Sequence, residues 1–416
     1  MFSPRRTRIT QTSIENSTGL LDDFLLAAAC WYLSGLVAFL GFSFGHEVVI
    51  RGSTAAARDV GWLGMFSSGS GRRYRQIAEE GYAGDGARDS RPAAFPAYPL
   101  MGRALRAATG LPIEAGLLVV SNASLLGAFV LLARYLRTRQ QNAPAALPDW
   151  TLCAISVFPT GCFFRMCYAE STFLLVAIAA MYGMLRRWPL PALVLLVGLA
   201  TATRATGVAL LGPLAAHIWR DRQALRARAW RLALWLPLAC WGLVAFVAFQ
   251  YAVLGDALAS AHAQSIFRVR PAVDWPRKLV DLATFEPLRV VYDPDSPAYW
   301  AATERLGVPW FSLWFANPLF FVVAVALTAV GAYKRWVTSV ESMFVALMLL
   351  IPYVTRAHEM GMQGMGRFVA VAFPIYVVLG QLFSRVPIVV ATGLLAIFGF
   401  FLAAYSALFA AGYLIV

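Results

Sequence analysis

The chain has 416 residues, of which 59% are hydrophobic and only 14% are charged, and its net charge is +13. Soluble domains carry roughly 45–50% apolar and about 25% charged residues, so this composition excludes an aqueous globular fold. All cations except Lys278 and Lys334 are arginines. That bias is typical of a GC-rich bacterial genome, and it gives no reason to expect a nucleic-acid partner.

Apolar runs recur along the whole chain, and a membrane-spanning helix needs roughly 20 such residues. We therefore predict an all-α polytopic membrane protein with about 11 transmembrane helices, forming a single membrane domain over residues 1–416. The expected spans lie near 20–43, 113–134, 150–168, 171–185, 189–203, 206–219, 232–254, 310–332, 340–355, 366–383 and 387–414.

The distribution of cations predicts the orientation. With the N-terminus in the cytoplasm, the inner segments carry a net charge of +10 and the outer segments +3, as the positive-inside rule requires. Two long loops, 44–112 and 255–309, then lie outside. For a bacterial protein this places the chain in the inner membrane, with its elaborated surface facing the periplasm or exterior.

Three ionisable side chains interrupt the apolar runs on the outer side: Glu170, Arg204 and Arg367. Burying a charge in a bilayer costs at least roughly 2.5–3.5 kcal/mol, so such residues are candidates for function. Each alone could simply pair with another helix or reach the headgroups. Because all three face the long loops, we expect them to line one cavity beneath the first outer loop, open laterally to lipid.

Converging arginines suit a phosphate group, and a nearby carboxylate suits a general base. Glycosyl transfer from a polyprenyl-phosphate sugar needs both the phosphate-binding cations and the carboxylate base. No metal or other cofactor is expected. The four histidines are scattered, His358-Glu359 lacks the second histidine of a zinc-protease motif, and the five cysteines lie in apolar segments.

Several segments, in chain order, resemble the PIG-V type GPI mannosyltransferase family and its bacterial relatives. They cover roughly residues 57–380 and comprise Tyr74 to Tyr82 with Phe95 to Leu100, Phe158-Pro159-Thr160 with Tyr168-Ala169-Glu170-Ser171, Thr203 to Gly207, Gly255 to Ala259 with Ala263-Gln264, and Gly366-Arg367-Phe368 with Phe373-Pro374.

The resemblance implies a GT-C fold and an inverting transfer of mannose from a polyprenyl-phosphate donor to a lipid or glycan acceptor outside the cytoplasm. It implies substrate-binding roles for residues in the matching motifs: Tyr74, Glu79, Tyr82, Tyr168, Glu170, Arg204, Gln264 and Arg367. For each tyrosine alone, plain anchoring at the membrane interface is the favoured interpretation, because aromatic side chains at that depth usually serve as anchors.

The family's first loop begins with a Trp-Asp pair whose aspartate is the expected base. Here Gly69 and Ser70 stand at those positions. Asp59, followed by Gly61 and Trp62, is the best replacement and is our candidate catalytic base; pairing with Arg58 or capping a short helix is its structural alternative.

Two other classes of function stay open. Loss of the acid would make the chain an inactive, scaffolding relative of the family. A transporter or lipid flippase would also combine many spans with intramembrane charges, although transporters usually hold these at mid-membrane within internal repeats, and no repeat is visible here.

Overall fold

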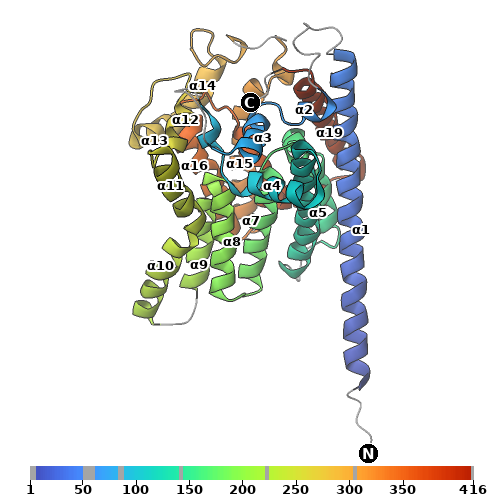
Figure 1. Cartoon of the computed structure of the whole chain (residues 1–416). Helices are drawn as coiled ribbons and strands as arrows, with labels where there is room; N and C mark the ends of the chain where they lie inside the picture. Colours follow the sequence, from blue (N-terminus) through green and yellow to red (C-terminus); the bar gives the residue numbers. More distant parts are fainter. Residues whose placement is uncertain are drawn as a thin grey trace, which may run out of the picture.

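The computed structural model describes residues 6–49, 61–82, 89–139, 144–220, 224–302 and 307–413, and within these ranges it is all helical, without a strand. A bundle of apolar helices forms the body of the molecule (Figure 1). The long helix α1 (Arg6–Phe44) stands at one edge of this bundle and runs on into a short π-helical turn, Gly45–Val49.

In the described part of the chain, five helical stretches are long and apolar enough to cross a membrane: Gly19–Val48, Ile113–Arg139, Leu313–Tyr333, Ser339–Ala357 and Ile388–Ala410. The last four contain α5 (Ile113–Arg139), α15 (Leu313–Tyr333), α16 (Ser339–Pro352) with the π-helix Tyr353–Ala357, and α19 (Ile388–Ala410). The chain is therefore a multi-pass membrane protein, as its composition predicts.

Three further apolar pairs are bent at a short break, which raises the number of candidate spans to eight. They join the 3₁₀ helix Pro159–Arg165 to α7 (Glu170–Leu185) at 97°, α10 (Leu225–Ala239) to α11 (Trp241–Leu254) at 49°, and α17 (Met365–Val371) to α18 (Pro374–Phe383) at 74°.

Shorter apolar helices complete the bundle: α6 (Leu147–Ser156), α8 (Leu190–Thr203) and α9 (Leu211–Trp219), which follows the 3₁₀ helix Ala205–Leu210.

The expected continuous span over 150–168 is wrong, because α6 ends at Ser156 and the chain continues as a 3₁₀ helix from Pro159. Proline has no amide hydrogen and disfavours helical backbone in the residue before it. Length alone supports five to eight spans, and about eleven stays a prediction.

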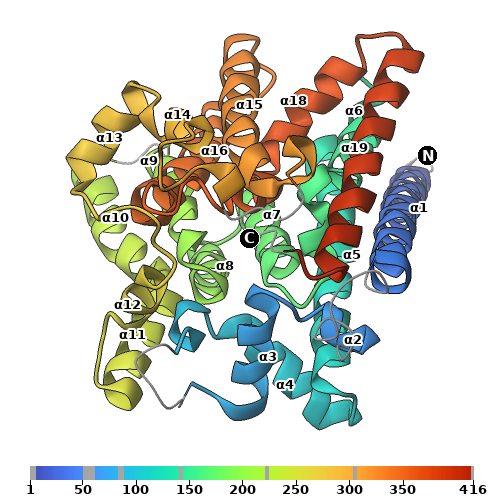
Figure 2. The ribbon, with the colours of Figure 1, turned by 90° about the horizontal axis from the view of Figure 1, so that it is seen from above.

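The two long loops are folded where they are described, and they lie at the end of the bundle opposite the N-terminus (Figure 1). The first forms α2 (Trp62–Met65), α3 (Ser70–Glu80) and α4 (Ala97–Thr109). The later loop forms α12 (Ala259–Ser265), α13 (Trp275–Ala283) and α14 (Glu286–Tyr292). Viewed from above, α3 and α4 lie over one side of the bundle and α12–α14 over another (Figure 2).

Candidate functional site

Glu170, Arg204 and Arg367 meet below α3. Arg367 donates from Nε to Glu170 Oε1 at 2.7 Å and also pairs with it through Nη2, while Arg204 Nη1 lies 3.2 Å from the same oxygen. All three side chains are buried, Glu170 completely. The expected convergence of these residues is confirmed, and both arginines share one carboxylate.

The cluster extends into the first outer loop through Ser70, whose Oγ accepts hydrogen bonds from Arg367 Nη1 at 3.2 Å and from Arg73 Nη2 at 2.6 Å. Tyr168 supports both partners. Its ring lies 4.6 Å from the Arg367 guanidinium, and its hydroxyl accepts from Ser70 N at 3.1 Å and donates to Ser68 O at 3.0 Å. The outer loop is thus fixed directly on the buried charges.

A tight turn between α8 and the following 3₁₀ helix positions Arg204. The amide of Gly207 donates to Arg204 O at 2.9 Å, and a Cβ on Gly207 would lie 2.4 Å from the backbone carbon of Ala200. Only glycine allows this close approach of the two backbone segments. The close backbone approach therefore explains why the Thr203-to-Gly207 motif ends in a glycine.

Arg367 is positioned by contacts to its neighbour Gly366. Gly366 N donates to Asn317 Oδ1 at 2.8 Å, and Thr160 Oγ1 donates to Gly366 O at 2.9 Å. A Cβ on Gly366 would lie 2.9 Å from the Thr160 methyl group. The Phe158-Pro159-Thr160 segment and the Gly366-Arg367 pair, far apart in sequence, are in direct contact.

A cavity of about 90 Å³ lies above this cluster, between the outer loops and the ends of the bundle helices. It is lined from α3 by Ser70, Arg73 and Tyr74, from the first loop by Ala93, Ala94 and Phe95, from the α8 turn by Thr203 to Thr206, from the later loop by Gln264 and Phe267, and from the late helices by Pro352, Thr355, Arg356, Arg367 and Phe368.

Four arginines line the cavity, and no carboxylate among the described residues does. The expectation that Arg204 and Arg367 line one cavity is confirmed, whereas the expectation that Glu170 lines it with them is wrong, because both arginines cover its carboxylate. With Glu170 just beneath, the site carries four positive charges and one negative charge, a net +3. Within the described chain, Arg73 and Arg356 have no carboxylate partner: Arg73 bonds to Ser70 and faces the Phe267 ring at 5.1 Å, and Arg356 Nε donates to Met360 Sδ at 3.0 Å. Burial lowers the pKa of Arg73, so a bound anion would stabilise its charged form.

Sequence reasoning missed Arg73 and Arg356. Arg73 follows another arginine in a polar loop, where nothing distinguishes it from a solvated residue. Arg356 comes directly after the expected span 340–355, and an ionisable residue at the outer end of an apolar run is a signal that could have found it.

Some of the other predicted site residues line the cavity, and others lie outside it. Tyr74 and Gln264 line the cavity. Tyr82 lies outside it, where its hydroxyl donates to Ala94 O at 2.7 Å and its ring packs on Phe246. Glu79 is exposed on α3, away from the cavity, so neither Tyr82 nor Glu79 is placed to touch a ligand there. Asp59, the candidate base, lies outside the described residues.

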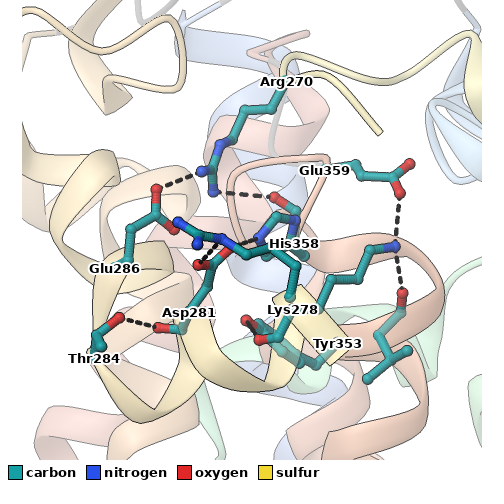
Figure 3. Close-up of polar contacts among 10 residues, drawn as sticks. Arg270, Lys278, Asp281, Thr284, Glu286, Tyr353, His358 and Glu359 are labelled. Atoms are coloured by element: carbon teal, nitrogen blue, oxygen red, sulfur yellow. Dashed lines mark hydrogen bonds and ion pairs between the residues drawn. The ribbon is translucent and has the colours of Figure 1, made fainter. Parts of the chain in front are cut away.

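One group of potential metal ligands occurs in the described part of the chain: Asp281, Glu286 and His358 each offer an atom within 4.8 Å of the others (Figure 3). Both Asp281 oxygens are already engaged, Oδ1 by Arg277 Nε at 2.9 Å and Oδ2 by His358 Nε2 at 3.0 Å, and Glu286 pairs with Arg270. Cations therefore already neutralise both carboxylates, and we assign no metal here. All five cysteines are free thiols.

Comparison with known proteins matches no family model and no curated protein.

Proposed function

We propose that the chain is a membrane glycosyltransferase that moves mannose from a polyprenyl-phosphate donor to a lipid or glycan acceptor on the non-cytoplasmic face. The observation that carries the proposal is the cavity with four arginines and one underlying carboxylate. Guanidinium groups bind phosphate oxygens bidentately, and in a water-poor site they stabilise the charge that develops on a departing phosphate. The ordered sequence resemblance to the PIG-V type family, which implies a GT-C fold, agrees with this chemistry.

Within the proposal the arginines have two roles. Arg204 and Arg367 are held by Glu170, so their charge is partly neutralised and their geometry is fixed. Arg73 and Arg356 have no acidic partner among the described residues and are therefore the better phosphate ligands. Asp59 remains our candidate for the base that takes the proton from the acceptor hydroxyl.

The location of the charges favours an enzyme over a transporter. Glu170 begins α7, Arg204 follows the last residue of α8, Arg356 lies beyond α16, and Arg367 is in the first turn of α17. These residues lie at helix ends or, for Glu170, at the 97° break of a bent pair, and Arg367 contacts the first outer loop through Ser70. A transport pathway would instead hold its charges near the middle of the membrane.

The test combines transfer with binding. Purified protein in lipid nanodiscs is incubated with labelled polyprenyl-phosphate mannose and a membrane extract, and in parallel its affinity for farnesyl phosphate is measured against farnesol. We expect Arg73→Gln and Arg356→Gln each to weaken farnesyl phosphate binding by about tenfold or more, because a hydrogen bond to a charged group contributes about 1.5–3 kcal/mol.

The matched control is Arg72→Gln, which removes the exposed neighbour of Arg73 on the same helix. It should leave binding and transfer unchanged. Asp59→Asn with transfer within threefold of wild type would eliminate Asp59 as the base. Farnesyl phosphate bound no better than farnesol would refute the proposed phosphate site itself, while phosphate binding without transfer in any acceptor mixture would favour the inactive alternative.

A further inference from the structure

The later outer loop is attached to the segment that follows α16 by a buried network of charged groups (Figure 3). Lys278 Nζ, in α13, donates to Glu359 Oε1 at 2.6 Å and to Val354 O at 2.7 Å. In return, Tyr353 donates its hydroxyl hydrogen to Lys278 O at 2.8 Å. Lys278 and Glu359 are 6% and 4% exposed, so this pair lies almost wholly out of water.

Backbone and further ion pairs strengthen the same junction. The carbonyl oxygen of Glu359 accepts from both Val269 N and Arg270 N at 3.0 Å, and its carboxylate also pairs with Arg268. His358 is hydrogen-bonded to Asp281 of α13 at 3.0 Å. Two chain segments, 268–281 and 353–359, are thereby joined at several points.

One of these segments lines the cavity, and residues just before the other line it as well. Thr355 and Arg356 lie between Val354 and Glu359, and Phe267 and Gln264 lie one and four residues before Arg268. The guanidinium of Arg356 has no carboxylate among the described residues to hold it, and its Nε bonds only to a thioether. Its position therefore depends on how the backbone around it is held, and the junction holds that backbone on both sides.

Transferring two charges out of water has a large free-energy cost, so an apolar contact could attach the loop more favourably. The best-attested use of a buried ion pair is to specify one arrangement of the chain among several. Building on the proposed function, we infer that Lys278 and Glu359 are positioning residues. They lock the later outer loop onto segment 353–359, so that Arg356 faces the phosphate of the lipid donor and Phe267 closes the wall beside it. We name the Lys278–Glu359 pair, with the Asp281–His358 hydrogen bond, the loop latch.

The variants are chosen to separate the latch from ordinary stability. Lys278→Met and Glu359→Gln each remove one side of the pair, and the exchange Lys278→Glu with Glu359→Lys restores it in reverse. Arg289→Met is the matched control, because Arg289 is an exposed cation on α14 of the same loop. Two quantities are measured in nanodiscs well below the unfolding temperature: amide hydrogen exchange over 268–281 and 353–360, and affinity for farnesyl phosphate.

We expect Lys278→Met and Glu359→Gln to speed exchange in both segments by about tenfold or more and to weaken farnesyl phosphate binding to a similar degree. Glu359→Gln leaves the buried Lys278 without a carboxylate, and Lys278→Met leaves the buried Glu359 with only the partly exposed Arg268 as its cation. The charge exchange restores the pair but places a second cation beside Arg268, so it should recover only part of both losses. Arg289→Met should change neither. In a transfer assay the latch variants should raise KM more than they lower kcat, because they misplace a binding group.

Unchanged exchange in both segments would overturn the latch. Faster exchange with unaltered farnesyl phosphate affinity would also overturn it, provided that Arg356→Gln weakens that affinity as expected. If wild-type protein does not bind farnesyl phosphate at all, the proposed function fails, and hydrogen exchange alone then decides whether the latch orders segment 353–360.

Discussion

Among the residues that the structure describes, Glu170 is the one acidic group paired with Arg204 and Arg367, and its removal should destabilise the protein as a whole. Glu170→Gln leaves Arg204 and Arg367 buried without a counter-charge, and breaking a buried pair in this way costs about 3–5 kcal/mol. We expect a clear loss of stability in thermal unfolding of the detergent-solubilised protein.

The matched change is Glu80→Gln. Glu80 also pairs with an arginine, Arg91 at 3.1 Å, but its side chain is 64% exposed. An exposed pair contributes about 0–1 kcal/mol, so this variant should unfold close to wild type. Equal unfolding midpoints for the two variants would show that the Glu170 cluster adds nothing to stability.

His358 gives the outer junction a dependence on pH. Burial lowers its pKa, which is partly opposed by the hydrogen bond that its Nε2 donates to Asp281, and Arg270 and Glu286 also face it. The folded protein therefore favours neutral histidine, whereas the unfolded chain binds a proton near the ordinary pKa of 6.5. The stability due to this neutral histidine is present above pH 6.5 and is lost as the pH falls through the lower folded-state value.

We expect the thermal midpoint of wild type to fall on acidification below about pH 6.5, the usual histidine pKa, and His358→Gln to show a smaller fall. His262→Gln serves as the control, because His262 is paired with Asp256 but its side chain is 69% exposed. A wild-type fall no larger than that of His358→Gln would exclude His358 as the titrating group.

At the scale of helices, α1 packs on α19 with almost no space between the backbones. A Cβ on Gly41 would lie 2.3 Å from Ala403 O, and one on Gly45 would lie 2.0 Å from Ala407 O. Gly41→Ala and Gly45→Ala should therefore push the helices apart and destabilise the protein by about 1–3 kcal/mol each, as overpacked cores do.

Gly399 of α19 provides the comparison, since a Cβ there would meet nothing within 4 Å. Gly399→Ala should be neutral or stabilising by up to about 1 kcal/mol, the helix-propensity difference between the residues. Thermal unfolding of the three variants checks this, and a stable Gly45→Ala protein would mean that α1 is free to shift against α19.

The sequence predicts the helices of this fold better than their interruptions. Apolar length is a local property, and in lipid the backbone must satisfy its hydrogen bonds within each helix, so apolar runs become helices. The break at Pro159 was readable from proline chemistry, but the 97° turn before Glu170 depends on contacts made by distant segments, such as Thr160 with Gly366.

The site was predictable to the same extent. Glu170, Arg204 and Arg367 stand out because charges are costly in apolar runs. Arg73 and the latch residue Lys278 lie in loops, where a cation is ordinary until the tertiary structure buries it. Local sequence holds no signal for that burial.

At the scale of the whole molecule, the predicted orientation can be checked by labelling. Thr109→Cys and Asp295→Cys place exposed thiols on the two outer loops, and Lys334→Cys places one on a predicted inner connector. In intact cells a membrane-impermeant maleimide should label the first two and should reach the third only after permeabilisation. The reverse pattern would invert the topology and place the arginine cavity on the cytoplasmic side.

The cavity's charge rests on arginines, which remain protonated at any physiological pH. A polyprenyl-phosphate sugar is a diester with one negative charge, whereas the lipid phosphate left after transfer is a monoester that gains a second charge above about pH 6. On the proposed function, a site with net charge +3 retains the spent lipid more strongly than it holds the fresh donor. Release of the lipid phosphate would then limit the turnover rate. The enzyme would turn over faster at mildly acidic pH, where the lipid phosphate carries one negative charge less.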